Sequence, residues 1–274
     1  MTLVNALLVR LADAVLAPLA GLPPVAVVAG CALGSALAVL AVMRFTSNQA
    51  ALAAVKRRIH AALLEMRLYN DDLVALVRAQ GEVLRHNLSY VGLSLVPLVI
   101  TAVPLTLAIA QLQAWYGYTG ITPGTPVVVT AAVAGNAGAA LPRLEGAGVD
   151  LAGPPRFFPT LGEMTWRVVP RTPGPTTLRV VTAGGAVVEK HLYVSAGDEV
   201  ARRSPVRELP SFVGQLLYPS EPPIEAAAGV AAIHLPYPER LLPVAGQAVH
   251  WLYVYLALTL AFVLLLRKPL GVVV

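Results

Sequence analysis

Three stretches of the chain are apolar over a length that suits a lipid bilayer. Residues 25–43 carry no charge over 19 positions, residues 88–112 carry none over 25, and residues 249–266 form a third apolar run. About 20 apolar residues in a helix cross a hydrocarbon core of about 30 Å. The pattern therefore predicts three transmembrane helices, at residues 24–43, 88–113 and 249–266.

Residues 44–87 combine charge with a helical repeat of apolar positions. The segment has seven basic and four acidic residues. Its apolar residues recur every three or four positions, as in a coiled-coil seam. They are Leu52, Val55, Ile59, Ala62, Met66, Tyr69, Leu73, Leu76 and Val83. One helix of this length would end roughly 65 Å from its start, although both ends must meet the membrane. We therefore predict an antiparallel helical hairpin.

The reversal of this hairpin is predicted near Tyr69 and Asn70. Asn70 is a favourable N-cap for the return helix, and Asp71 and Asp72 suit its first turn, where the helix dipole favours negative charge. Each arm has a single apolar face and needs the other arm, or a partner protein, to cover it.

Beyond residue 120 the composition changes to Pro, Gly, Val, Thr and Arg. Four runs rich in strand-forming residues are separated by Gly and Pro turns, at residues 126–133, 163–169, 176–182 and 186–194. A tryptophan, Trp166, followed by the last two runs is typical of the later strands of a small immunoglobulin-like sandwich. We predict an all-β immunoglobulin-like sandwich over residues 120–218 and a Pro-rich return to the membrane over residues 219–247.

The amino-terminal segment, residues 1–21, is predicted to be an interfacial amphipathic helix, because most of its apolar residues recur on one face and Asn5, Arg10 and Asp13 on the other. In the first span, Gly30 and Gly34 form a G-x-x-x-G pair that lets a neighbouring helix approach closely. We expect helix packing there rather than homodimerisation.

Composition and charge support a multi-pass protein of the cell (inner) membrane. Hydrophobic residues make up 57% of the chain and charged residues 13%, and the mean hydropathy is +0.69. Basic residues gather in residues 44–87 and at Arg267 and Lys268, and short basic segments stay in the cytoplasm. The predicted topology has the N-terminus outside, the hairpin inside, the sandwich outside and the tail, residues 267–274, inside.

The sequence lacks the motifs of common enzymes and metal sites, such as a Walker loop, G-x-S-x-G or H-E-x-x-H. We therefore expect a non-enzymatic protein without catalytic, cofactor-binding or metal-ligating residues, and no DNA partner. The triplet Lys56, Arg57 and Arg58 could contact phosphate groups of lipid or ribosomal RNA, although topology and solubility of the hairpin also explain it.

Polar residues in the second span allow two interpretations. Pro97 and Pro104 interrupt its hydrogen-bond ladder, and four polar side chains lie inside or near the bilayer, namely Ser94, Thr101, Thr106 and Gln111. They could line a hydrophilic groove, or they could satisfy carbonyls that the prolines free. The sequence leaves both interpretations open.

The order of these segments resembles the YidC/Oxa membrane-insertase superfamily, and above all its short three-span archaeal and endoplasmic-reticulum members. The strings that carry the resemblance are residues 42–46, 85–97 and 251–271. It implies a hydrophilic groove open to lipid and a hairpin that contacts the ribosome, a translocon or a client. The β domain is then an insertion between the last two spans.

Two functions follow from this organisation. The first is an insertase-like membrane chaperone that passes membrane-protein clients through a polar intramembrane groove, because unpaired polar groups in lipid cost several kcal/mol. The alternative is a structural or sensory subunit of a membrane complex, whose β-sandwich binds an extracytoplasmic protein partner while the hairpin docks a cytoplasmic one.

Overall fold

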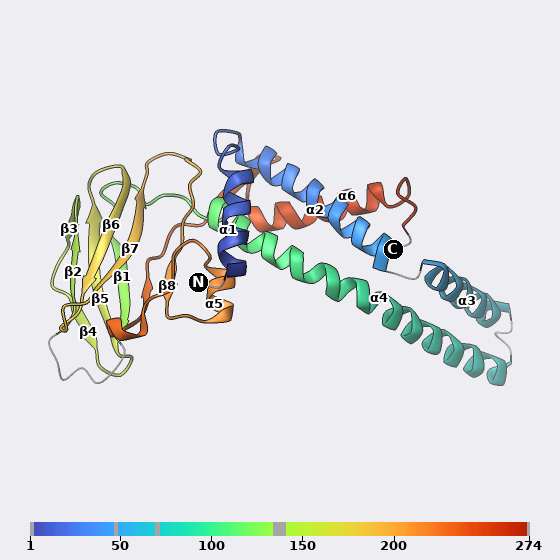
Figure 1. The fold of residues 1–274 in the computed structure, drawn as a ribbon. Coiled ribbons are helices and arrows are strands. Elements are labelled where there is room, and N and C mark those ends of the chain that lie inside the picture. The colour runs from blue at the N-terminus through green and yellow to red at the C-terminus, as the bar shows by residue number, and fades with distance from the viewer. Residues whose placement is uncertain (1–2, 47–48, 69–71, 134–140, 273–274) are drawn as a thin grey trace. The chain divides into compact units, whose positions relative to one another are not determined.

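The computed structural model describes residues 3–46, 49–68, 72–133 and 141–272. The chain divides into two compact units. We call residues 1–28 with 107–254 the β unit, and residues 29–106 with 255–274 the helical unit. Figure 1 labels the elements of both.

The helical unit contains the greater part of each of the four long helices. They are α2 (Pro24–Thr46), α3 (Gln49–Leu68), α4 (Leu73–Tyr116) and α6 (Trp251–Leu266). Within the described residues, α2 and α4 are long and apolar enough to cross a membrane. The apolar α6 has 16 residues and is about 24 Å long, which is shorter than a typical span.

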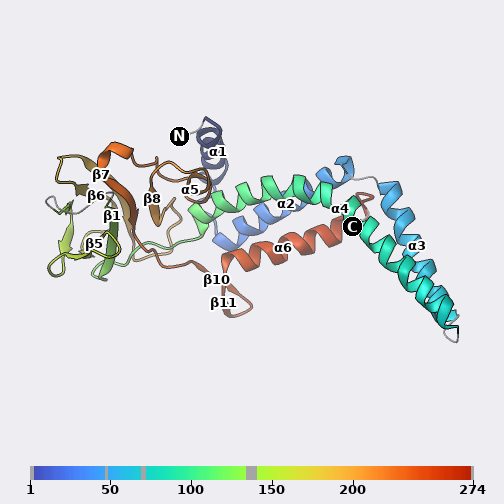
Figure 2. The same cartoon turned by 90° about the horizontal axis from the view of Figure 1, so that it is seen from below.

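The helix α4 is continuous over 44 residues, so the return arm of the hairpin and the second apolar run form one helix. Its first part and α3 run side by side in opposite directions in both views (Figures 1 and 2). Leu52 and Ala62 of α3 and Ala79 of α4 are buried. This agrees with the expected hairpin, with small alanines supporting much of the contact.

The start of α4 can be compared with the expected return arm of the hairpin. The expected turn residues Tyr69, Asn70 and Asp71 lie outside the described residues, but α4 begins at Leu73 with Asp72 before it. The Asp72 carboxylate accepts a hydrogen bond from the backbone N–H of Val74 at 2.9 Å, so Asp72 caps the start of α4. Leu73, expected in the seam, is exposed, because it falls on a different side of the helix from Ala79.

In the helical unit α2 packs against α6 and the turn that follows it. Ala36 and Leu40 form a buried cluster with Val263 and Val272. The Tyr255 hydroxyl donates to Ser35 Oγ at 2.7 Å. The small side chain of Ala36 allows α2 and α6 to pack together.

The glycine pair of α2 lies on a different side of this helix from Ala36. Gly30 and Gly34 are exposed, and a Cβ atom added to either would have nothing within 4 Å. Neither glycine faces another helix among the described residues, because the buried positions Ala32 and Ala36 lie on the other side of α2.

The β unit is built on two antiparallel sheets. The larger has the order β3-β5-β1-β9-β8, and β4 also pairs with β5. Its strands are β1 (Val127–Val133), β3 (Val149–Leu151), β4 (Arg156–Phe158), β5 (Glu163–Pro170), β8 (Val206–Glu208) and β9 (Val230–His234). The smaller sheet, β2-β6-β7, consists of β2 (Arg143–Gly146), β6 (Gly174–Val181) and β7 (Val187–Val194). A separate hairpin joins β10 (Leu241–Val244) to β11 (Gln247–His250).

The two sheets share one hydrophobic core. Val129 and Trp166 of the larger sheet and Leu178 and Leu192 of the smaller one belong to the same buried cluster. The β strands alternate buried and exposed residues, most regularly in β7. The β-rich domain expected from the sequence is therefore present, and its four expected runs correspond to β1, β5, β6 and β7.

Residues 219–247, expected to be a plain return segment, contribute a strand to the larger sheet. In this segment β9 pairs with β1, with Thr130 opposite His234 and Ala131 opposite Ile233. Ile233 is fully buried. This apolar run is short and lies between prolines, so the sequence does not indicate a strand there. Because β9 is part of the larger sheet, the β domain extends well beyond residue 218.

Two short helices complete the β unit. They are α1 (Leu3–Leu16) at the start of the chain and α5 (Phe212–Leu217) between β8 and β9, and a single 3-10 turn spans Ala226–Ala228. The helix expected within residues 1–21 corresponds to α1.

Candidate functional site

A stripe of exposed apolar residues follows α4 from the hairpin into the apolar run. Its members recur at three, four or seven positions and so share one side of the helix. They are Leu73, Val77, Leu84, Leu88, Val91, Leu95 and Leu98, each between 52% and 75% exposed. We call these seven residues the α4 stripe. Its first three members precede the uncharged run that begins at residue 88, so the apolar surface continues past the part of the helix that lipid would cover.

The hairpin part of α4 has two other faces. Arg78 is exposed and Glu82 half-buried, and they form an i,i+4 ion pair at 3.8 Å. Arg85 lies on the same side. Leu76 and the buried Ala79 face the seam. Large exposed apolar patches in proteins mark interaction surfaces, so the α4 stripe is a candidate interaction surface.

The four groove candidates do not gather at one place. Ser94 is half-buried and Thr101 is buried on the same side of α4. Thr106 is exposed. Gln111 is buried in the β unit, where its side-chain oxygen accepts a hydrogen bond from Arg202 at 3.2 Å.

The hydroxyl groups of the two threonines bond to their own helix. Thr101 Oγ1 donates to the carbonyls of Pro97 and Leu98, both at 2.9 Å, and Thr106 Oγ1 donates to Ala102 at 2.8 Å. Prolines at 97 and 104 free the carbonyls four residues earlier, Leu93 and Ile100. The threonines therefore make ordinary backbone contacts and do not repair the proline gaps.

The triplet Lys56, Arg57 and Arg58 is exposed on α3. All three side chains can reach solvent or a negatively charged partner. Their exposure fits both interpretations given above, because a solubilising surface and a phosphate-contacting surface are equally open.

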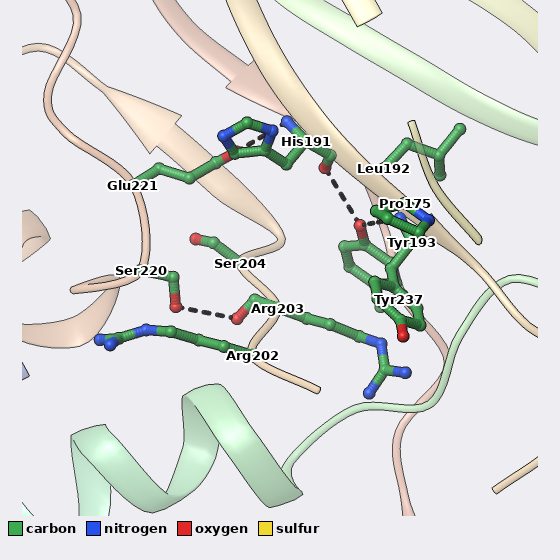
Figure 3. A pocket seen from close by; sticks show the side chains of 10 residues that line it. All are labelled: Pro175, His191, Leu192, Tyr193, Arg202, Arg203, Ser204, Ser220, Glu221 and Tyr237. Atoms are coloured by element: carbon green, nitrogen blue, oxygen red, sulfur yellow. Dashed lines mark hydrogen bonds between the residues drawn. The ribbon is translucent and has the colours of Figure 1, made fainter. Parts of the chain in front are cut away.

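A pocket of about 190 Å³ with several polar lining residues lies in the β unit (Figure 3). Its lining residues come from β6 and β7, from the segment before β8, from the segment between α5 and β9, and from the segment after β9. The lining residues are Pro175, His191, Leu192, Tyr193, Arg202, Arg203, Ser204, Ser220, Glu221 and Tyr237. The pocket is large enough for a few waters or a small polar molecule.

A buried ion pair lies behind one wall of this pocket, and its Glu221 member lines the pocket. The Lys190 ammonium donates to the Glu221 carboxylate, and both side chains are almost fully shielded from solvent. Lys190 also donates to the Ser204 carbonyl at 2.6 Å, and the other Glu221 oxygen accepts from the His191 backbone N–H at 2.7 Å. Burial lowers the pKa of Lys190, and the Glu221 carboxylate opposes that shift. Both charges therefore have the partners that burial requires.

The Tyr237 hydroxyl forms a second wall and bridges the backbone of β7. It accepts from the Tyr193 N–H at 3.0 Å and donates to the His191 carbonyl at 3.1 Å, as the dashed lines of Figure 3 show. Burial raises the pKa of Tyr237, and the Tyr193 N–H opposes the rise. The phenol thus satisfies backbone groups at this edge of β7, next to the isolated bridge between Ile121 and Val194.

Two buried arginines hold the loop that precedes β8. Arg203 donates to the carbonyls of Tyr118 and Glu199, at 3.0 and 3.1 Å, and its guanidinium lies 4.7 Å from the Tyr193 ring centre. Arg240 donates to the same two carbonyls and to the Asp198 carboxylate. Burial lowers the pKa of Arg203, and the nearby Arg240 charge adds to the effect. These cations organise backbone rather than bind a ligand.

Arg202 extends from the backbone in the opposite direction to Arg203 (Figure 3). It donates to the Asp13 carboxylate of α1 at 2.6 Å, to Gln111 of α4 at 3.2 Å and to the Pro219 carbonyl at 3.4 Å. Trp115 Nε1 also donates to Asp13, at 3.3 Å. One arginine therefore joins α1, the end of α4 and the segment after α5.

Sequence reasoning missed these buried charges, although one signal was available. Lys190 lies on the same side of β7 as Val188, Leu192 and Val194, and all four are buried. For Arg203 and Arg240 no comparable signal exists, because arginine is usually exposed.

Among the residues that the structure describes, no group of three or more His, Cys, Asp and Glu side chains could hold a metal ion. Comparison of the chain with protein-family models, with curated proteins and with solved structures gave no match. The functional conclusions therefore rest on the geometry above.

Proposed function

We propose that this chain is a non-enzymatic, insertase-like membrane protein that helps membrane-protein clients to insert or fold. The observation that supports it best is the α4 stripe. A helix arm that exposes Leu73, Val77 and Leu84 in water carries a cost of about 25 cal/mol for each Å² of apolar surface left uncovered. An apolar client segment would cover the same residues and then meet Leu88 to Leu98 further along the same helix.

The membrane arrangement in this proposal has three spans, with α2, α4 and the shorter α6 crossing the inner membrane. The N-terminus and the immunoglobulin-like β domain lie outside, and the hairpin and C-terminus lie in the cytoplasm. Support comes from two helices of spanning length and from the basic residues of the hairpin and of Arg267 and Lys268. The order of segments, with its likeness to three-span YidC/Oxa proteins, supports the same arrangement.

The polar groove of this proposal would follow the side of α4 that carries Ser94 and Thr101. Between residues 91 and 106, Pro97 and Thr101 are the buried positions of α4. Most of this helix is therefore not enclosed in a tight apolar bundle, which favours a lipid-open surface over a rigid scaffold.

Site-specific photo-cross-linking tests this function in reconstituted vesicles. A photoreactive residue at Val77 should cross-link a translated reporter that contains one Leu/Ala segment of spanning length, and the same residue at Arg78 should cross-link it much less. Changing Leu73, Val77 and Leu84 together to Gln should remove most cross-linking and reporter insertion, since the stripe loses its apolar surface while the spans are unchanged.

The matched control changes the charged face of the same arm while keeping its charges, as Arg78→Lys, Glu82→Asp and Arg85→Lys. This variant should retain cross-linking and insertion. Equal activity of the glutamine variant and the control would refute a role of the α4 stripe in client binding.

A sensory or structural subunit is the second candidate, and the pocket of the β unit favours it. Its His191 imidazole and Ser220 hydroxyl can donate hydrogen bonds to a small anionic group on an extracytoplasmic partner. Acetate or phosphate should then raise the unfolding temperature of the chain more than chloride at equal ionic strength. No difference between the anions would count against this candidate.

A further inference from the structure

The β unit exposes apolar side chains on two short helices. On α1 they are Leu7, Leu11 and Val15, which recur every four residues, and on α5 they are Phe212, Val213 and Leu217. Phe212 is 82% exposed, which is unusual for an aromatic residue in a water-facing domain. We call these six residues the apolar platform.

The outward direction of the α1 stripe is fixed by what lies on the inner side of the helix. Asn5 and Leu16 are buried, and Asp13 accepts hydrogen bonds from Arg202 and Trp115. Asn5 is thus buried and Asp13 half-buried, while Leu7, Leu11 and Val15 face outward. Hydrophobic collapse alone would turn this helix the other way, so the exposed stripe needs an apolar environment.

The second helix, α5, is attached to the larger sheet. Ser211 Oγ accepts from the Gly214 N–H at 2.9 Å and donates to the Glu208 carboxylate of β8 at 2.7 Å. The Leu209 N–H donates to Ala231 of β9 at 2.9 Å. The exposed side chains of α5 therefore have a fixed place on the β unit.

Arg202 connects the two helices. Its guanidinium bonds to Asp13 of α1 and to the Pro219 carbonyl, two residues after α5 ends. Both views place α1 and α5 beside each other (Figures 1 and 2). The six apolar residues therefore belong to one region of the β unit.

The ends of the apolar helices identify the surface that this region meets. Pro24 begins α2 eight residues after α1 ends at Leu16, and Trp115, near the end of α4, bonds directly to α1 through Asp13. Trp251, at the start of α6, donates to Gln113 of α4 at 2.9 Å. Both tryptophans are buried, and the bond from Trp115 to Asp13 places α1 beside the end of α4, the level at which α4 leaves the bilayer in the proposed arrangement.

We propose that the apolar platform rests in the headgroup region of the same bilayer and that Arg202 fixes the β unit to it. The partner is a lipid surface, into which such helices bury their apolar face by about 5–10 Å. Arg10, exposed at the edge of the α1 stripe, suits lipid phosphate. This inference rests on the membrane placement within the proposed function and does not depend on client binding.

Fluorescence quenching in reconstituted vesicles tests the platform on the full-length chain. Single cysteines at Leu11, Phe212, Leu95 and Leu161, in a Cys31→Ser background, would carry an environment-sensitive dye. The vesicles would contain phosphatidylcholine and phosphatidylglycerol, with a quencher on the lipid or iodide in the water. Leu161 is the matched control, an exposed leucine in the turn between β4 and β5.

The dyes at positions 11 and 212 should lose emission with the lipid-borne quencher and resist iodide, and the dye at position 161 should do the reverse. Position 95 is the reference for a span. Quenching by lipid at 95 but not at 11 and 212 would overturn the platform and leave the membrane placement intact. Protection from both quenchers at 11 and 212 would indicate a protein neighbour and would also overturn it. An unquenched position 95 would overturn the membrane placement and the platform together.

A second variant examines the role of Arg202. Arg202→Met keeps the unbranched apolar stem of the side chain and removes its bonds to Asp13 and Pro219. Lipid quenching at position 212 should then fall, while position 11, which the chain itself ties to α2, should keep its quenching. Unchanged quenching at position 212 would show that Arg202 does not hold the platform together.

Discussion

The Lys190 ammonium and the Glu221 carboxylate form an ion pair within the β unit from which solvent is almost excluded. Removing one member leaves the other charge buried without compensation, which costs about 3–5 kcal/mol. We expect Lys190→Met and Glu221→Gln each to lower the free energy of unfolding by that amount. The double variant should lose clearly less than the sum, and denaturant unfolding followed by Trp166 fluorescence measures all three. Additive losses would contradict this coupling.

Tyr237→Phe keeps the ring and removes the hydroxyl that bridges β7. The Tyr193 N–H loses its acceptor, so we expect the free energy of unfolding to fall by about 1–3 kcal/mol at neutral pH. Denaturant unfolding of the two proteins measures this difference. The control is Tyr218→Phe, which removes the hydroxyl of a tyrosine outside the pocket lining and should have a smaller effect.

The natural chain and Tyr237→Phe should also respond differently to alkaline pH. Burial raises the pKa of Tyr237 above 10, the ordinary value of a tyrosine, so above pH 10 the unfolded chain releases a proton that the folded chain retains. The stability that Tyr237 contributes is therefore complete below pH 10 and declines as the pH rises further. The difference in unfolding temperature between the two proteins should narrow from pH 9 to pH 11, and a constant difference would contradict the shift.

Fragments of the β domain should differ in their ability to fold. A fragment of residues 117–241 contains β9, Glu221 and Arg240, and should melt cooperatively with a β-type circular dichroism spectrum. A fragment of residues 120–218 lacks all three and leaves Lys190 unpaired, so we expect no cooperative melt. A cooperative melt of the shorter fragment would show that β9 is dispensable.

Cysteine labelling from either side of intact membranes tests the proposed topology. Leu64 in α3 and Leu161 in the β unit are similarly exposed, at 66% and 67%, so their reactivity can be compared directly. In a Cys31→Ser background, a membrane-impermeant reagent should reach a cysteine at 161 from outside and one at 64 only after the membrane is opened. Labelling of both from the same side would refute the topology.

The sequence predicted those parts of the fold that depend on repeated local patterns. Uncharged runs of sufficient length became α2 and α4, and strand-like runs around Trp166 and Val188 became β5 and β7. Both signals come from side chains that repeat with the period of the element, so one sequence is enough to detect them. The expected hairpin seam was also partly right, since Leu52 and Ala62 are buried.

Features that depend on distant parts of the chain could not be predicted in this way. The strand β9 is short, and only its pairing with β1 shows that it lies inside the sheet. Gly30 and Gly34 have the spacing of a packing motif, but Ala32 and Ala36 are on the buried side. The ion pair of Asp13 with Arg202 links residues 189 positions apart, and no local sequence pattern specifies it.

The pairing of β1 with β9 has a consequence for the order of synthesis. Strand β1 lies between β5 and β9, yet β9 leaves the ribosome roughly a hundred residues later, after about 5–20 s at ordinary rates of translation. Until then one edge of β1 has unpaired N–H and C=O groups and is open to wrong pairing. A nascent chain stalled before β9 has left the ribosome should therefore be more prone to aggregation and proteolysis than the released full-length chain, in which β9 pairs with β1.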